Sequence, residues 1–576
     1  MITLMTRYLR PYRRLVWWVL LLTFLQTLSS LYLPNLMSHI VDTGIIKGNI
    51  GYIVAIGGFM LAVTVLGGFA SIFASLYAAK SSAGFGQILR TRVFSHVTQF
   101  TLQEFDQIGT SSLIVRTNND IMQVQQLVNM MLRMMVMAPL TAMGGIIMAV
   151  YTDARLSWII VVVMPILGLA IYLVLGKGIA LFRAMQTKVD NLNRVVRENL
   201  TGVRVIRSFN RMDYEIQRFD GANQDLTDVS VRVYKIMAAL MPLMIVIINL
   251  STIAIVWFGS LRVNTGQLQI GSLMAFIQYV MQIMFAVMMV SMMAFMIPRG
   301  QASAARINEV LAINPEVTDP LNPKLLEPGP GLVEFSHVTF SYPGAEEPAI
   351  ADVSFTMRPG ETTAIIGGTG SGKTALVSLI PRFYDVDSGI IRVDGVDVRD
   401  MTQATLRNKI GYVPQRATLF TGSVADNIRY GNLEASDAMV RHAADVAQAT
   451  NFVVEFPDQF DAIISQGGNN LSGGQKQRLC IARAIVRHPE IYIFDDSFSA
   501  LDYRTDSDLR SALKEELNDA TLLIVAQRVS TVKDADQIIV LEEGRVVGMG
   551  THSELLQSSP VYKEIVASQL SQEEIA

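Results

Sequence analysis

The residues with the clearest chemical potential form the glycine-rich segment GGTGSGKT at positions 367–374. A strand-like run, TTAII, precedes it and a helical stretch follows, which is the context that a phosphate-binding loop requires. Glycines let several backbone N–H groups converge on phosphate oxygens. We predict that Lys373 neutralises phosphate charge and that the Thr374 hydroxyl coordinates Mg²⁺. The predicted phosphate-loop residues are Gly367, Gly368, Thr369, Gly370, Ser371, Gly372, Lys373 and Thr374.

A second chemical feature is the acidic pair in FDDSFSALD, residues 494–502. Asp495 ends the apolar run IYIFD, so we expect a buried strand that presents this carboxylate to Mg²⁺. Asp496 stands where an ATPase of this kind usually has a glutamate that activates water. The sequence therefore raises the question of whether this site hydrolyses its own nucleotide.

A large part of the chain outside these motifs is apolar. The chain is 51% hydrophobic and only 17% charged, which is unusual for a wholly soluble protein of 576 residues. Six apolar runs are long enough to cross a bilayer, which takes about 20 residues each. These runs cover residues 15–36, 52–79, 134–152, 156–176, 236–259 and 272–297.

The distribution of basic residues predicts the orientation of these spans. The alternate links 37–51, 153–155 and 260–271 contain only Lys47, Arg155 and Arg262, whereas the other basic residues of this half lie on the opposite side. The positive-inside rule therefore places both termini in the cytoplasm, for a multi-pass protein of the bacterial cytoplasmic membrane. The lone cysteine, Cys480, excludes an internal disulfide framework.

Two long polar segments, 80–133 and 177–235, connect spans on the cytoplasmic side. Their spaced apolar residues and their scarcity of Pro and Gly predict helices that continue well beyond the membrane. Each segment has one break, near Gly109 and near Gly202. A break so far from the membrane indicates a contact point for a cytoplasmic domain, although an ordinary helical hairpin explains the same local pattern.

Beyond the spans the sequence changes character. A proline-rich stretch predicts an extended linker, and short β-rich runs then alternate with helical stretches, which is typical of an α/β nucleotide-binding domain. The expected organisation is a six-helix transmembrane domain over 1–312, a linker over 313–330 and an α/β ATP-binding domain over 331–576.

The stretch LSGGQ, residues 471–475, resembles the signature of the ATP-binding cassette (ABC) family. One six-helix membrane domain fused to one cassette is similar, over the whole chain, to a bacterial multidrug-exporter half-transporter of the MsbA type. The resemblance implies two half-transporters with two ATP molecules between their cassettes, each held by one phosphate loop and the other chain's signature. The signature residues implied to contact ATP are Ser472, Gly473, Gly474 and Gln475.

The resemblance assigns further roles by position. Tyr342, in FSYPG, resembles the aromatic residue that stacks on adenine. Gln415, in YVPQ, resembles the residue that reaches Mg²⁺ and senses the membrane domain. Asp502, in SALD, resembles the loop that communicates across the cassette interface. The breaks near Gly109 and Gly202 would then be coupling helices that dock on cassettes. The implied ligands are ATP and Mg²⁺.

The sequence departs from the family at two positions that would face the γ-phosphate. Asp496 replaces the catalytic glutamate, and Gln527, in LLIVAQRVS, replaces a histidine. Gln466 also stands near the signature where related exporters often have glutamate. The pattern resembles the degenerate-site subunit of a heterodimeric exporter. It implies a partner half-transporter with the consensus Glu and His, and slow hydrolysis at this chain's own site.

The cargo is less determined by the sequence. Thirty methionines are present, and fifteen of them lie in or beside the third and sixth runs, which suits either a cavity for varied apolar molecules or packing against lipid. The leading interpretation is export of hydrophobic or amphipathic compounds. Lipid flipping, uptake by an exporter-like fold, and a nucleotide-gated regulator or channel remain alternatives. Basic residues without aromatic interleaving make no case for nucleic-acid binding.

Overall fold

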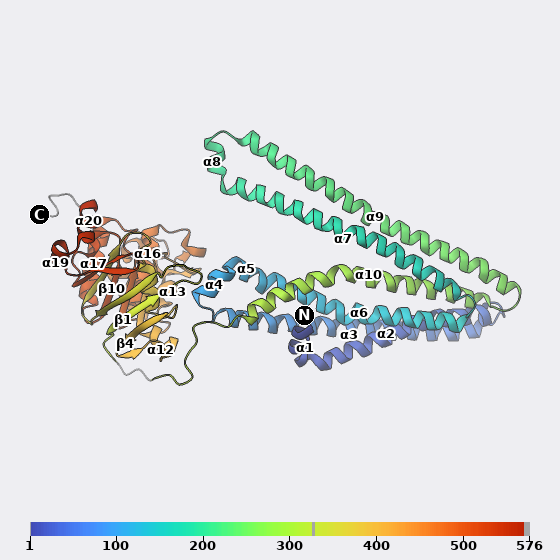
Figure 1. Ribbon diagram of the computed structural model, residues 1–576. Coiled ribbons are helices and arrows are strands. Elements are labelled where there is room, and N and C mark those ends of the chain that lie inside the picture. The colour runs from blue at the N-terminus through green and yellow to red at the C-terminus, as the bar shows by residue number, and fades with distance from the viewer. Residues whose placement is uncertain (1, 325–328, 570–576) are drawn as a thin grey trace. The chain divides into compact units, whose positions relative to one another are not determined.

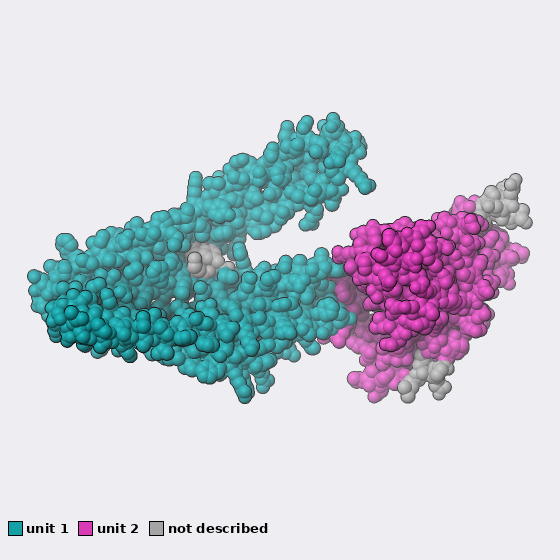
Figure 2. Space-filling view, turned by 180° about the vertical axis from the view of Figure 1, so that it is seen from behind, with its two compact units in different colours: residues 1–98, 110–313 teal, residues 99–109, 314–576 magenta. Residues whose placement is uncertain are grey.

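The computed structural model describes residues 2–324 and 329–569, so part of the predicted linker, residues 325–328, lies outside the described residues. The chain forms two compact units (Figure 2). Unit 1 comprises residues 1–98 and 110–313, and unit 2 comprises residues 99–109 and 314–576. The segment 99–109, which contains the first predicted break, thus belongs to the same unit as the predicted nucleotide-binding domain.

Unit 1 is helical, and six of its helices are long and apolar enough to cross a membrane. Its elements are α1 (Ile2–Tyr8), η1 (Arg10–Tyr12), α2 (Arg13–His39), η2 (Ile40–Ile45), α3 (Ile50–Val97), α5 (Thr110–Val115), η3 (Arg116–Asp120), α6 (Ile121–Thr152), α7 (Trp158–Thr201), α8 (Val203–Ser208), α9 (Met212–Asn264) and α10 (Ile270–Ala312). Five of the six predicted runs fall within one of these helices, and the fourth, 156–176, starts two residues before α7. The predicted extensions are confirmed, because α3 at 48 residues is about 72 Å long, more than twice a bilayer core.

Within unit 1, α7 and α9 form an antiparallel hairpin that diverges from α2, α3, α6 and α10, and α8 lies at its tip (Figure 1). The other four helices pack closely where small residues face a neighbour. At Gly145 on α6, for example, a Cβ atom would lie 2.7 Å from Cγ1 of Ile283 on α10. Close backbone approach of this kind is how helices associate in a lipid environment, where no hydrophobic effect drives them together.

Buried carboxylates join the ends of these helices. Asp42 accepts hydrogen bonds from the backbone N–H groups of Gly271 (2.7 Å) and Ser272 (3.2 Å), at the start of α10. In the long helical extensions, Asp120 accepts hydrogen bonds from the Arg306 guanidinium, at 2.8 Å and 2.5 Å. These contacts satisfy groups that a helix end or a buried ion would otherwise leave unpaired.

Unit 2 is an α/β domain. Its strands are β1 (Val333–Phe340), β2 (Ile350–Met357), β3 (Thr362–Gly367), β4 (Ser388–Val393), β5 (Val396–Asp397), β6 (Ile410–Val413), β7 (Gly422–Ser423), β8 (Ile463–Ile464), β9 (Ile491–Asp495), β10 (Thr521–Val525), β11 (Gln537–Glu542) and β12 (Arg545–Gly550). Its helices are α4 (Leu102–Ile108), α11 (Lys373–Leu379), α12 (Gln403–Asn408), α13 (Val424–Arg429), α14 (Asp437–Val446), α15 (Thr450–Val453), η4 (Gln459–Asp461), η5 (Gln466–Gly468), α16 (Gly473–Ile485), α17 (Tyr503–Glu516), α18 (Val529–Val532), α19 (His552–Ser558) and α20 (Pro560–Gln569).

The main sheet of unit 2 has the strand order β12-β11-β3-β10-β9-β6 and is parallel except for β12. A second sheet, β2-β1-β4-β5, is antiparallel. All five residues of β9 and of β10 are buried, as expected for parallel strands with both faces covered. The predicted fold class, a membrane α-helical domain fused to an α/β domain, is confirmed.

The predicted breaks in the long polar segments are also present. Gly109 has φ +80° and ends α4, while Gly202 separates α7 from the short helix α8. In unit 2, Glu104 of α4 accepts a hydrogen bond from the backbone N–H of Glu316 at 3.0 Å. This bond ties α4 to the chain segment that leads into the α/β domain.

We predict that Asp42→Ala lowers the thermal stability of unit 1. The first residues of α10 lose both acceptors, and the loss of a capping acceptor costs about 0.5–2 kcal/mol. Thermal unfolding of the detergent-purified protein, followed by intrinsic fluorescence, measures the shift. Asp42→Asn is the matched control, because it keeps one acceptor and is expected to retain most of the stability. An unchanged melting temperature for Asp42→Ala would contradict the capping role.

Candidate nucleotide-binding site

The predicted phosphate loop connects the end of β3 to α11, and its glycines are needed for steric reasons. Gly370 and Gly372 adopt φ values of +83° and +97°, which favour glycine. A Cβ atom on Gly372 would lie 2.5 Å from the Ala349 carbonyl oxygen, and one on Gly367 would lie 2.2 Å from the Leu541 carbonyl oxygen. The loop therefore follows a path that only glycine allows at these positions.

Lys373 folds back onto this loop. Its Nζ donates to the carbonyl oxygens of Gly367 (2.9 Å) and Gly368 (2.7 Å) and lies 3.3 Å from the Ser371 hydroxyl. Burial lowers the pKa of Lys373, while the nearby carboxylates of Asp496 and Asp495 act in the opposite direction. The ammonium group is thus held at the loop, where it can meet a phosphate oxygen.

Asp495 lies at the end of β9, and its side chain suits a metal ion. The residue is 2% exposed, and its Oδ1 atom is buried with no hydrogen-bond partner among the described residues. Burial, and next the charge of Asp496, raises the pKa of Asp495 to about 6. An ionised carboxylate is costly in this position unless a cation accompanies it. Thr374 and Gln415 line the same pocket, so the three predicted ligands fit Mg²⁺.

Asp496 is held by two amide side chains. Its Oδ2 atom accepts hydrogen bonds from Nε2 of Gln415 at 3.2 Å and from Nε2 of Gln527 at 3.1 Å. Its backbone adopts φ +46°, an uncommon value for a residue other than glycine. The two positions that the sequence marks as departures from the family, Asp496 and Gln527, therefore meet at a single oxygen atom.

Tyr342 lies at the other end of the site in an aromatic cluster. Its ring centroid is 5.0 Å from that of Phe340 and 5.6 Å from that of Tyr384, and the residue is 40% exposed. A partly exposed ring that its neighbours hold in place can stack on a base. Sequence reasoning missed Tyr384, and it missed Tyr412, whose hydroxyl lies 3.5 Å from Asp495 Oδ2. Tyr412 is the first residue of the YVPQ motif, so this motif could have indicated that Tyr412 lies near the site.

These residues surround one pocket with a volume of about 430 Å³. Its lining comprises Tyr342, Ala349, Thr369, Gly370, Ser371, Gly372, Lys373, Thr374, Ala375, Gln415, Asp495, Asp496, Val525 and Gln527. The structure thus brings together predicted residues from the phosphate loop, from the end of β9 and from the segments that follow β6 and β10. Gly367 and Gly368 lie next to the lining, as acceptors for Lys373.

The signature residues do not line this pocket. Ser472 caps α16: its hydroxyl accepts from the backbone N–H of Gln475 at 3.3 Å, and the Gln475 side chain accepts from the N–H of Ser472 at 2.9 Å. A reciprocal capping box of this kind fixes the start of a helix. Ser472 and Gly473 are exposed, and a Cβ atom on Gly474 would lie 3.1 Å from the Ala500 carbonyl oxygen, so the signature adjoins the SALD segment.

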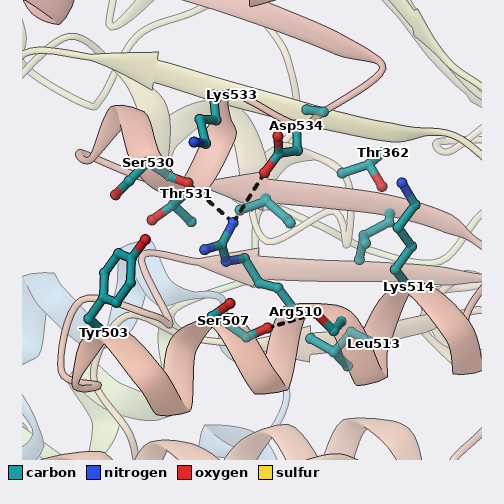
Figure 3. A pocket seen from close by; sticks show the side chains of 14 residues that line it. Thr362, Tyr503, Ser507, Arg510, Leu513, Lys514, Ser530, Thr531, Lys533 and Asp534 are labelled. Carbon is teal, nitrogen blue, oxygen red and sulfur yellow. Dashed lines mark hydrogen bonds and ion pairs between the residues drawn. The ribbon is translucent and has the colours of Figure 1, made fainter. Parts of the chain in front are cut away.

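A second pocket of unit 2, of about 440 Å³, lies between α17 and the segment that contains α18 (Figure 3). Arg510 of α17 lines it. Its Nη1 atom donates to the Ser530 carbonyl oxygen at 3.2 Å and lies 3.8 Å from Asp534, while its Nη2 atom lies 3.1 Å from Asp506. Since α17 begins after Asp502 and α18 begins two residues after Gln527, Arg510 links the segments that follow these two site residues.

The fold and site define a membrane protein with a fused ATP-binding cassette. Two family models match, the ABC transporter transmembrane region over residues 16–287 and the ABC transporter domain over 350–499. The chain is 44% identical to an uncharacterized ABC transporter ATP-binding protein of Mycobacterium tuberculosis, over 99% of this chain and 98% of the relative. The chain therefore belongs to the ABC transporter family, and its homologues are exporter half-transporters.

Other relatives have named cargo. One is the ATP-dependent lipid A-core flippase of Desulfotalea psychrophila, with 33% identity over 82% of each chain. Another is the fatty acid ABC transporter ATP-binding/permease protein of Mycobacterium bovis, with 35% identity over 83% of this chain and 75% of the relative. Among solved structures, a bacterial Atm1-family ABC exporter with ATP bound matches with a TM-score of 0.80 and 25% identity, over 97% of this chain and 99% of that chain.

We predict that Asp495→Asn stabilises the protein when metal and nucleotide are absent. Because the wild-type carboxyl has a pKa raised to about 6, it is ionised and unpaired at pH 7.5, which costs about 1–3 kcal/mol. The difference is expected to shrink as the pH falls through 6, because the wild-type carboxyl then becomes neutral.

Thermal unfolding in EDTA measures this effect, and Mg²⁺ with ATP is then expected to stabilise the variant less than the wild type. Asp508→Asn is the control, because Asp508 is an exposed carboxylate on α17. A variant that is no more stable than the wild type at pH 7.5 would contradict the interpretation of Asp495.

Proposed function

We propose that this ABC exporter chain is one half of a heterodimer, that it hydrolyses ATP slowly at its own site, and that its LSGGQ segment completes the active site of the partner. The observation that carries the proposal is the contact of Asp496 Oδ2 with the amides of Gln415 and Gln527. The cargo that we propose is a hydrophobic or amphipathic compound, moved across the cytoplasmic membrane.

Hydrolysis requires a group that orients and deprotonates water at the γ-phosphate. The Asp496 side chain is one methylene shorter than glutamate, which withdraws its carboxylate by about 1.5 Å. A misplacement of about 1 Å can lower a rate on the order of 10²-fold. In addition, two amide N–H groups already occupy the Oδ2 atom. These features disfavour Asp496 as an efficient base.

Gln527 adds a second restriction. An amide can donate a hydrogen bond to a phosphate oxygen, but it carries no charge and does not titrate near neutral pH, unlike histidine. Its Nε2 also points at Asp496, 3.1 Å away. Both residues that would act on the γ-phosphate are therefore engaged with each other.

The residues that we propose for holding the nucleotide are not affected by these two departures. Tyr342 would stack on the base, Lys373 and the loop backbone would bind phosphate oxygens, and Thr374, Gln415 and Asp495 would hold Mg²⁺. When bound there, Mg²⁺ would supply positive charge that offsets the charge of the phosphates. A complete binding set beside a weakened hydrolytic pair favours a site that retains ATP more than it turns it over.

Two features support a second chain. The capped start of α16 is exposed and lies outside the pocket of its own cassette, so its N–H groups can face a phosphate bound elsewhere. At the tip of the α7–α9 hairpin, α8 and its flank expose apolar side chains, with Val205 61% and Phe209 71% exposed. We propose that α8 docks on the partner's cassette, which would cover these side chains.

The relatives guide the choice of cargo and direction. Two of them are named for lipid A-core and for fatty acid, so lipid flipping is the second candidate function. We propose the domain limits 1–312, 313–330 and 331–576, and cytoplasmic termini on the basis of the Lys and Arg distribution. A nucleotide-gated channel would show a conductance that does not require ATP hydrolysis, and an importer would show the opposite direction of transport in vesicles.

We predict that Asp496→Glu combined with Gln527→His raises ATP hydrolysis by the purified chain about 10- to 100-fold. The longer carboxylate would reach the attacking water, and the imidazole would be free to contact the γ-phosphate. Phosphate release measures the rate, and adding Lys373→Ala to the double variant is the control that should abolish the gain. Robust hydrolysis by the unmodified chain, undiminished by Asp496→Asn, would contradict the proposal.

We further predict that Ser472→Ala reduces ATPase activity of the assembled heterodimer more than Asp496→Asn does. Ser472 would serve the partner's hydrolytic site, whereas Asp496 belongs to the slow site. The two variants are compared at equal protein concentration, after gel filtration has confirmed assembly. Equal losses would indicate two equivalent sites.

A further inference from the structure

A cavity of about 500 Å³ lies in unit 1 between α2, α6 and α10. Its volume is in the range of small-molecule sites, about 300–1,000 Å³. Its lining comprises Thr23, Gln26, Gln126, Asn129, Met130, Arg133, Met134, Met137 and Met289. We refer to it below as the Arg133 cavity.

The unusual member of the Arg133 cavity is the arginine itself. It is half-buried, and within the part of the chain that the structure describes it forms no ion pair and no hydrogen bond. Two other arginines of unit 1 have buried carboxylate partners: Arg262 lies 2.9 Å from Asp153, and Arg306 lies 2.5 Å from Asp120. A half-buried guanidinium that has donors without acceptors and lines a cavity points to a site for an anion.

The position of Arg133 along α6 indicates that the Arg133 cavity has one end near the headgroups and one end toward the bilayer interior. Arg133 precedes Thr152, the last residue of α6, by 19 positions, or about 28 Å, which is close to the thickness of a bilayer core. It therefore lies near headgroup level, at the end of the span opposite the link between α6 and α7. Met134 and Met137 follow it toward the bilayer interior.

The other α6 residues of the lining are mostly polar at the headgroup end of the cavity and apolar at the interior end. The six from α6 recur at helical spacing on one face of the helix. The amides of Gln126 and Asn129 lie on the aqueous side of Arg133. The Asn129 side chain uses its Nδ2 atom to donate a hydrogen bond to Ser82 at 3.1 Å, and this bond does not use its carbonyl oxygen. Flexible thioethers line the other side, together with Met289 of α10, and adapt to apolar chains of varied shape.

We propose that the Arg133 cavity binds a single-chain amphipathic anion, with its carboxylate or phosphate head on Arg133 and its apolar tail along the methionines. The inference deepens the proposed export function and rests on it for its biological meaning. The same head chemistry occurs in a transported anion and in bulk anionic lipid, so the test separates these two sources.

The experiment measures binding of radiolabelled hexadecanoate to the full-length chain in phosphatidylcholine nanodiscs. Arg133→Gln is expected to weaken binding about 10- to 100-fold, because a charge-assisted hydrogen bond is lost. Binding of hexadecyltrimethylammonium is expected not to weaken, because its head carries the same charge as Arg133. Arg155→Gln is the matched control, since it removes an exposed arginine beyond the other end of α6, and it should bind hexadecanoate like the wild type.

Three results would overturn the proposal. The first is equal hexadecanoate binding by Arg133→Gln and the wild type. The second is a loss of hexadecanoate binding in Arg155→Gln equal to that in Arg133→Gln. The third is displacement of labelled hexadecanoate by phosphatidylglycerol nanodiscs as effectively as by unlabelled hexadecanoate, which would make the site a contact for bulk lipid. If Arg133→Gln is poorly folded, Met137→Gln replaces it. This variant should reduce the gain in affinity from octanoate to hexadecanoate and keep the preference for anions.

The assay requires neither ATP hydrolysis nor a partner chain. A failure of the heterodimer proposal would therefore appear in the phosphate-release measurements and leave the binding result intact. Conversely, absent anion binding together with partner-dependent ATPase activity would reject the Arg133 cavity alone.

Discussion

The nucleotide site depends on the parallel register of three strands. β10 lies between β3 and β9, and Val525 pairs with Ile365 on one side and with Asp495 on the other. Because parallel strands end at the same edge of a sheet, the phosphate loop after β3, the acidic pair at the end of β9 and Gln527 after β10 emerge together. A change of register by one residue would separate these groups, whatever their individual chemistry.

This geometry also explains how a few substitutions can change one side of the site while the phosphate loop and Asp495 keep their positions. Asp495 faces the phosphate loop from a fully buried strand, so its unpaired oxygen and raised pKa suit a bound cation. Asp496, one residue later, has left the strand with φ +46° and turns toward Gln415 and Gln527. In the function that we propose, binding and hydrolysis rest on these adjacent residues in different surroundings, so one can weaken while the other persists.

In unit 1, the partners of the charged side chains distinguish residues that join helices from a residue that we propose binds a ligand. Asp42, Asp120 and Asp153 each satisfy a helix end or a cation, and these contacts hold helices that are far apart in the sequence. Arg133 has a cavity beside it in place of such a partner. Since a half-buried charge without a partner is costly, the difference between these groups is the physical basis for assigning a ligand to the cavity.

The sequence alone determined the six spans, their extensions, the breaks at Gly109 and Gly202, and the phosphate loop. These features are set by apolar runs, helix-breaking glycines and a local motif, all of which act over a few residues. It also marked Asp496 and Gln527 as departures. Only the tertiary structure decided that both meet at one oxygen, that Tyr384 joins the aromatic cluster and that Arg133 lacks a carboxylate partner among the described residues. Such contacts join residues that are distant in the chain, and strand register and helix packing bring them together.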